Sequence, residues 1–178
     1  MSQELDKSKG DIRAVLTNSY KAVSKEVCST TIDCSFSGTT LVSTLIVGNK
    51  IYCANIGDSR AILAKKPQGG KKWIAEALSN DHKPDLPKEK ARIEKSGGRV
   101  EPLLDEYDNA FGPPRVWLKD EDIPGLAMSR SIGDQVAGRV GVIAEPEIIE
   151  TTFGSDDKFL LLASDGIWEF ITNEEVGF

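Results

Sequence analysis

Apolar residues recur at a helical spacing between residues 11 and 27. Positions three and four apart face the same side of an α-helix, so this spacing predicts an amphipathic helix with one apolar stripe. Asp11 follows Gly10 and suits the cap at the start of such a helix. The stripe should lie on a flat, apolar surface. Its members are Ile12, Val15, Leu16, Ser19, Tyr20, Val23 and Val27.

The pattern changes to that of β-strands after this helix. β-branched and apolar residues fill short runs separated by turns, and residues 48–50 (Gly-Asn-Lys) are typical of a hairpin turn. Consecutive strands joined by short turns predict an antiparallel meander rather than strand–helix–strand units. The predicted strands are residues 39–47, 51–56, 60–65 and 73–78, with a break at 57–59 and a loop at 66–72.

A second helix is predicted over residues 85–98. Asp85 suits its cap, Pro87 suits its first turn, and Gly97 suits the exit from its last turn. Residues 99–104 then return to a strand pattern.

The second half of the chain combines one long polar stretch with two further strands. Residues 105–125 are acidic and contain several Gly and Pro residues, which predicts a long surface loop. Residues 147–153 alternate as a half-buried strand does, whereas residues 158–164 are apolar on both faces and predict a central strand. A helix is expected to begin near Thr172, but the few residues after it are too short a run to stabilise one.

Composition narrows the class of protein. The formal net charge of −6 argues against a nucleic-acid-binding protein, which usually carries a basic face. The three cysteines, Cys28, Cys34 and Cys53, are odd in number and have no Cys-x-x-Cys spacing, so neither a disulfide framework nor a zinc ribbon is expected. The polar start has no signal-peptide core, and no apolar run approaches the ~18 residues of a membrane span. We therefore expect a soluble intracellular protein, cytoplasmic or nuclear, that binds neither nucleic acid nor membrane.

Two acidic turns follow predicted strands. Asp58 lies in ANIGDSR (54–60), and Asp165 lies in ASDGIWE (163–169) after the most apolar strand. Asp beside Gly is common turn chemistry, so each residue can be explained as a turn former alone. A carboxylate at the end of a buried strand is nevertheless costly to desolvate unless it is paired or binds a metal. Glu169 follows Asp165 by four residues and can face the same side if a helical turn begins there.

Five blocks of the sequence, taken together, are more specific than either turn. They occur in the order SGTTLVSTLI (37–46), ANIGDSRAIL (54–63), LSNDHKP (78–84), LAMSRSIGD (126–134) and LLLASDGIWEF (160–170). With these blocks in this order, the chain resembles the metal-dependent protein Ser/Thr phosphatases of the type 2C family over nearly its whole length.

The resemblance implies an α+β fold in which two stacked antiparallel β-sheets are flanked by helices, a four-layer αββα sandwich. It implies a single catalytic domain over residues 1–178, incomplete at both ends, that acts as a monomer on phosphoprotein substrates. It also implies hydrolysis of phosphoserine and phosphothreonine by a water activated at a centre of two or more Mg²⁺ or Mn²⁺ ions, with no catalytic residues beyond the metal ligands.

The same resemblance assigns site residues. Asp165 matches the strand-end metal ligand, and Asp58 and Glu169 match the acidic residues that hold an additional, weaker cation. The family usually has Asp at the position of Glu169. Asp134 and Arg130 match structural positions, and Arg130 is better suited to an internal ion pair than to phosphate.

Parts of the family's site have no match in this sequence. Upstream of residues 11–27 there is no Asp-Gly-His-Gly block, which supplies a metal-bridging Asp and a His proposed as general acid, and no phosphate-holding Arg. The family's downstream Asp-Asn pair is also missing. The one histidine, His82, is expected in a loop or on the surface. This chain should therefore carry about half of a metal site and bind cations weakly.

Three hypotheses follow. The first is a protein phosphatase, the second is a phosphatase-like scaffold that has lost the site and binds partners, and the third is a β-rich domain with ordinary Asp-Gly turns. The order of the blocks disfavours the third, and the intact GDSR and SDGIWE sequences favour recent ancestry in an active enzyme. An Asp-Gly-His-Gly block encoded upstream would decide for the first, whereas a native start at Met1 would favour the second. Residues 105–125 resemble the variable flap beside the family's cleft, where they would contact the substrate protein; a solvated loop without such a role is the alternative.

Overall fold

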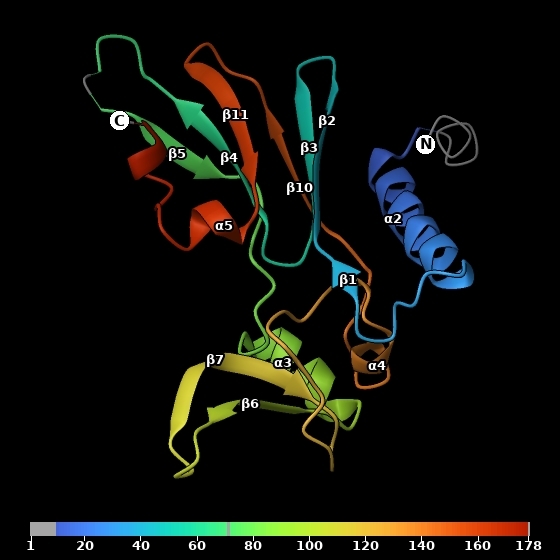
Figure 1. The fold of residues 1–178 in the computed structure, drawn as a ribbon. Helices are drawn as coiled ribbons and strands as arrows, with labels where there is room; N and C mark the ends of the chain where they lie inside the picture. Colours follow the sequence, from blue (N-terminus) through green and yellow to red (C-terminus); the bar gives the residue numbers. More distant parts are fainter. Residues whose placement is uncertain (1–9, 71, 178) are drawn as a thin grey trace. The chain divides into compact units, whose positions relative to one another are not determined.

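The computed structural model describes residues 10–70 and 72–177. The chain divides into two compact units, each built from segments that are distant in sequence (Figure 1). Of the described residues, unit 1 comprises those within 10–19, 41–81 and 146–177, and unit 2 comprises those within 20–40 and 82–145.

The first predicted helix is confirmed as α2 (Ile12–Ser29). The Asp11 carboxylate caps it by accepting a hydrogen bond of 3.1 Å from the Ala14 amide. The stripe is buried at Val15, Leu16 and Tyr20, whereas Val23 is 44% exposed. The apolar contact of this helix is therefore made mainly by its first half.

Unit 1 contains two three-stranded antiparallel sheets. Their strand orders are β10-β3-β2 and β11-β4-β5. The predicted hairpin between β2 and β3 is confirmed, because Val47 pairs with Lys50 and Gly48 takes a φ of +60° in the turn. The strands are β2 (Leu41–Val47), β3 (Lys50–Ile56), β4 (Arg60–Lys65), β5 (Ile74–Ala77), β10 (Glu147–Thr152) and β11 (Asp157–Ala163).

The two sheets of unit 1 pack through one apolar core. The buried cluster takes Ile51 and Cys53 from β3 and Ala61 and Leu63 from β4, with Leu78 beside them. Since β3 and β4 belong to different sheets, residues 57–59 carry the chain from one sheet to the other. The expected stacked antiparallel sheets are thus confirmed, although the strands do not form one continuous meander.

The prediction that residues 158–164 form a central strand is wrong. Within the described residues, β11 pairs with β4 alone and lies at the end of its sheet, so β4 is the central strand. Phe159 is 40% exposed and Leu162 is 37% exposed. The apolar composition of β11 favoured a buried strand, but composition does not show which strands pair with it.

Unit 2 contains a third three-stranded sheet and a core of its own. Its sheet has the order β6-β7-β8, and a separate short pair joins β1 to β9. Its buried cluster includes Ile93, Val100, Val116, Ala137, Val140 and Val142. The elements are β1 (Gly38–Thr39), α3 (Pro87–Lys95), β6 (Arg99–Leu104), β7 (Ala110–Trp117), β8 (Pro124–Leu126), β9 (Ile132–Gly133) and α4 (Gln135–Gly138).

The predicted loop over residues 105–125 is wrong, because β7 and the start of β8 lie within it. The misleading signal was the run Gly112–Pro114. The pairing of β6 with β7 is irregular there: Leu103 pairs with Phe111 and Glu101 pairs with Arg115. A bulge leaves residues out of the hydrogen-bond ladder, so proline, which has no amide hydrogen, is tolerated at that point.

Helix α3 begins one residue later than the predicted cap implies. Leu86 occupies the cap position and makes no side-chain cap hydrogen bond, so Asp85 is not the cap. Pro87 in the first turn is confirmed, as is Gly97 at the exit, where its φ is +85°. None of the helices in the described part of the chain is long and apolar enough to cross a membrane.

Candidate functional site

Asp58 lies in the tight link between β3 and β4. Gly57 precedes it with a φ of +91°, a conformation that glycine adopts without strain. The buried Asn55 side chain fixes this link, because its Nδ2 donates to the Gly57 carbonyl (3.1 Å) and to the Asn80 carbonyl (2.9 Å). Asp58 itself is only 4% exposed. The link therefore holds a carboxylate in a buried place at the end of two strands.

Strand pairing brings Asp165 to the same end of the sheet as Asp58. β11 runs antiparallel to β4, and Ala163 pairs with Arg60. Asp58 precedes Arg60 by two residues and Asp165 follows Ala163 by two residues, so both lie just beyond the same end of this strand pair. Unlike Asp58, Asp165 is exposed.

Trp168 anchors the short helix α5 (Asp165–Trp168) that carries Asp165. Its indole Nε1 donates to the Ala163 carbonyl (2.8 Å) and to the Arg60 carbonyl (3.1 Å). The Arg60 guanidinium also lies over the indole ring, 5.3 Å from its centroid. Glu169 follows with its amide bonded to the Asp165 carbonyl (2.9 Å), and its side chain is exposed.

Arg60 is committed to contacts within unit 1. Its Nε and Nη2 bind both carboxylate oxygens of Asp81 at 2.9 and 2.8 Å, and its Nη1 donates to Asn173 (2.8 Å). The hydrogen bonds that Arg60 donates to Asp81 raise the pKa of Arg60 above its ordinary value. The sequence interpretation assigned no role to Asn55, Asp81 or Trp168. Their blocks were recognised, but their pairing is visible only in the folded chain.

Replacing Trp168 with phenylalanine should loosen α5. An aromatic ring is kept but both hydrogen bonds of the indole are lost, which leaves partly buried carbonyls of β4 and β11 without these donors. We expect a cost of about 1–3 kcal/mol. Amide exchange at Glu169 should then accelerate about tenfold, as hydrogen-exchange mass spectrometry or NMR can measure. Trp73→Phe is the matched control, because Trp73 contacts Phe159 through its ring. Equal exchange in the two variants would show that the indole hydrogen bonds do not hold α5.

The predicted ligand set is partly brought together. Carboxylate oxygens are the donors that Mg²⁺ and Mn²⁺ take, so the donor type of Asp58, Asp165 and Glu169 fits such ions. In the part of the chain that the structure describes, however, no three Asp, Glu, His or Cys side chains lie close enough together to hold one ion. The three residues therefore do not form a closed ligand set here, and their role as ligands stays a prediction.

A second group of charged residues is buried in unit 2 around Glu89. Arg130 binds its carboxylate through Nη2 (2.7 Å) and Nε (3.1 Å), and Arg92 Nη2 (2.8 Å) and Ser129 Oγ (2.6 Å) also donate to it. Burial alone would raise the pKa of Glu89, but the hydrogen bonds from Arg130, Arg92 and Ser129 outweigh it and hold the pKa well below its usual range. The expected internal ion pair of Arg130 is confirmed.

Asp134 and His82 are also placed within unit 2. Asp134 accepts a short hydrogen bond from Ser131 Oγ and donates its amide to the Ser37 carbonyl (2.9 Å), which is a structural role as expected. His82 lies outside regular secondary structure as predicted, but it is only 2% exposed, so the surface alternative is wrong.

Comparisons of the sequence agree on one family. The family model for protein phosphatase 2C matches residues 1–177. The chain is 43% identical over 164 residues to probable protein phosphatase 2C 64 of Oryza sativa subsp. japonica, covering 92% of this chain and 38% of that protein. It is 44% identical over 172 residues to probable protein phosphatase 2C 52 of Arabidopsis thaliana, covering 96% of this chain and 36% of that protein. The chain thus spans well under half the length of these relatives.

Solved structures support the fold. A serine-threonine phosphatase 2C from Toxoplasma gondii superposes with a TM-score of 0.81 at 23% identity, over 98% of this chain and 57% of that chain. A C. elegans sex-determining protein superposes with a TM-score of 0.76, also at 23% identity, over 98% of this chain and 40% of that chain. These likenesses concern the fold, whereas the family model and the plant relatives concern descent. On that evidence, the chain belongs to the protein phosphatase 2C family.

Proposed function

We propose that this protein hydrolyses phosphoserine and phosphothreonine in protein substrates, as a monomer, in a reaction that depends on Mg²⁺ or Mn²⁺. Membership of the protein phosphatase 2C family supports the reaction class. The observation that carries the assignment of residues is the placement of Asp58 and Asp165 just beyond the same end of the β4–β11 pair. The flap role expected for residues 105–125 is part of the same proposal and would be filled by β7 and its flanking turns.

The chain's own residues divide into ligands and positioning residues. Asp58, Asp165 and Glu169 would hold the cations, which, when bound, supply an acidified water and charge stabilisation for the phosphoryl group. Asn55 keeps the Gly57 carbonyl, and so the link that carries Asp58, in place. Arg60 would be a positioning residue and not a phosphate ligand, since its guanidinium already donates to Asp81 and Asn173. Its carbonyl also accepts a hydrogen bond from Trp168.

The test is phosphate release from a phosphothreonine peptide while Mn²⁺ is titrated. Asp165→Asn keeps the size of the side chain but removes the charge that attracts the cation, so we expect turnover at a fixed Mn²⁺ concentration to fall about 100-fold or more. Mn²⁺ binding, followed by calorimetry, should weaken in parallel. Asp85→Asn is the control, because Asp85 is an exposed carboxylate outside both the proposed ligand set and residues 105–125.

Two outcomes would count against the proposal. Turnover that is independent of Mn²⁺, or that is equal in Asp165→Asn and Asp85→Asn, would remove Asp165 from the site. Binding of the phosphopeptide without any release of phosphate would instead support the scaffold hypothesis.

A further inference from the structure

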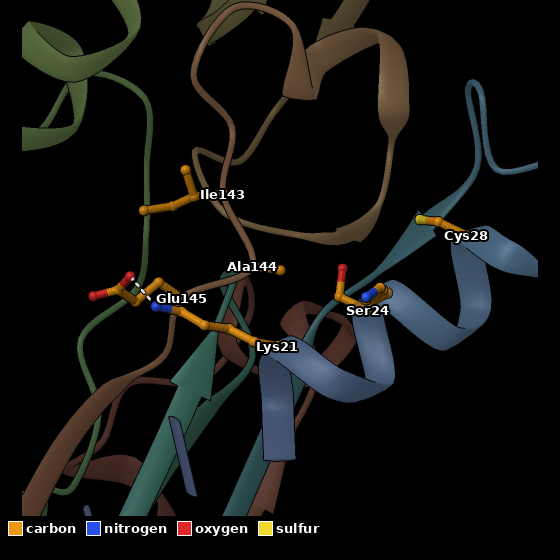
Figure 2. Close-up of a pocket in the computed structure, with 7 residues that line it drawn as sticks. Lys21, Ser24, Cys28, Ile143, Ala144 and Glu145 are labelled. Carbon is orange, nitrogen blue, oxygen red and sulfur yellow. Dashed lines mark ion pairs between the residues drawn. The ribbon is translucent and has the colours of Figure 1, made fainter. Parts of the chain in front are cut away.

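A pocket of about 380 Å³ in unit 2 opens beside the second half of α2 (Figure 2). The helix residues that line it are spaced three and four apart, so they share one face of α2. Lys21 forms an ion pair of 2.7 Å with Glu145 on the opposite wall, drawn as the dashed line in Figure 2. The lining residues are Lys21, Ser24, Lys25, Cys28, Ile143, Ala144 and Glu145.

One thiol of this pocket is in contact with a second thiol. Cys28 lines the pocket in the last turns of α2 and is partly exposed. Cys34, six residues further on, is only 5% exposed, and its side chain is hydrogen-bonded to Cys28. That hydrogen bond, followed by burial, raises the pKa of the Cys34 thiol. Cys28 is thus the more accessible residue of the pair, and Cys34 is the buried one.

The segment that carries Cys34 is fixed at both ends. The Thr30 amide donates to the Val27 carbonyl (3.2 Å), which turns the chain back at the end of α2. The Cys34 carbonyl accepts from the Gln135 amide (2.9 Å) at the start of α4. The meeting of the two thiols is therefore a property of the folded segment and not of a free loop.

We propose that Cys28 and Cys34 are a modification site at which a hydroperoxide forms a reversible disulfide. The Cys28 sulfur attacks the peroxide O–O bond, which breaks to give a sulfenic acid on Cys28 and one water. The Cys34 sulfur then displaces the hydroxyl oxygen as a second water and forms the S–S bond. In total two thiols and hydrogen peroxide give one disulfide and two waters, and a dithiol reductant restores both thiols.

The surroundings assign the two roles. Cys28 can meet a small peroxide because it lines an open pocket and is partly exposed. Cys34 is buried and its pKa is raised, both of which disfavour a first attack on peroxide and suit the resolving thiol.

Cys53 provides an internal control. It lies in β3 within the core of unit 1, is 1% exposed, and burial raises its pKa to about 12. A buried thiol of this kind is chemically inert. The proposal therefore predicts that two of the three cysteines react and that the third does not.

The experiment counts thiols in the whole protein after treatment with excess hydrogen peroxide at neutral pH, followed by denaturation. The expected count falls from three to one, a non-reducing peptide map shows a Cys28–Cys34 link, and dithiothreitol restores three. In Cys34→Ser, dimedone should label a sulfenic acid on Cys28. Cys53→Ser should lose both of its remaining thiols, as the wild type loses the same pair. Because the readout is chemical, it stands apart from any phosphatase assay.

Three results would overturn the proposal. They are an unchanged thiol count, a disulfide that involves Cys53, and a Cys28–Cys28 link between two chains. If Cys34→Ser does not fold, the wild-type count and peptide map decide the matter alone.

Discussion

Replacing Glu89 with glutamine should lower the free energy of unfolding by about 3 kcal/mol or more. The change keeps the size of the side chain but removes the negative charge that two arginines share. Arg130 and Arg92 are largely buried, with side chains 17% and 24% exposed, so both would remain in place with no carboxylate opposite them. Breaking a buried ion pair by removing one partner typically costs about 3–5 kcal/mol.

The measurement is urea denaturation at neutral pH, followed by tryptophan fluorescence. Glu94→Gln is the matched control on the same helix, because Glu94 pairs with Lys90 at 3.7 Å and its side chain is 53% exposed. An exposed pair of this kind contributes under about 0.5 kcal/mol. Similar losses in the two variants would show that the Glu89 group does not stabilise unit 2.

The same carboxylate predicts a pH dependence with a definite sign. The pKa of Glu89 is lowered in the folded protein, whereas in the unfolded chain it returns to about 4.3. The unfolded state therefore binds the proton more readily, and stability falls as pH drops below the unfolded value toward the lowered folded one. Wild-type protein should lose stability more steeply than Glu89→Gln between about pH 5 and pH 3, so the two curves should converge in acid. Parallel curves would contradict this account.

The second large effect is expected from Gly38→Ala. A Cβ atom at position 38 would lie 1.9 Å from Asp134 Oδ2 and 2.5 Å from Ser131 Oγ, where no side-chain atom fits. The added methyl group must push Asp134 aside and break its hydrogen bond with Ser131, both of which are buried. Overpacking costs about 1–3 kcal/mol and an unpaired buried polar group costs a similar amount, so we expect a total of about 3 kcal/mol or more.

Thermal denaturation of two further variants tests this reading. Gly138→Ala is the control, since a Cβ atom there would meet nothing within 4 Å and alanine favours the helix. The double variant Gly38→Ala/Asp134→Ala should lose less free energy of unfolding than the two single variants lose together, because removing the carboxylate makes room for the methyl group. If the losses of the two single variants simply add in the double variant, the methyl group does not clash with Asp134.

The sequence predicted those elements that depend only on residues close together in the chain. The α2 stripe and the β2–β3 hairpin belong to this group, because a helix face and a two-residue turn are local features. The bulge at Gly112–Pro114 was missed, because proline there is compatible with a strand only when the partner strand β6 supplies a matching irregularity. The edge position of β11 was missed for a similar reason, since strand order depends on partners distant in sequence.

The candidate site divides in the same way. Asp58 and Asp165 were proposed from the sequence because each follows a recognisable strand, and the pairing of β4 with β11 puts both just beyond the same end of that pair. The contacts that hold them were not predictable, because Arg60 lies 21 residues from Asp81 and 108 residues from Trp168. Contacts at such separations depend on the assembled sheets and leave no periodic trace in the chain.

Because residues 57–59 link β3 of one sheet to β4 of the other, the position of Asp58 depends on the distance between the two sheets. This link is a three-residue bridge between two layers, so it has no slack with which to absorb an insertion or a change in the spacing of the sheets. A bulkier residue at Ala61, which is fully enclosed between those layers, would displace the carboxylate without touching it. Interior positions that never meet a substrate should thus appear among the variants that impair this protein's chemistry.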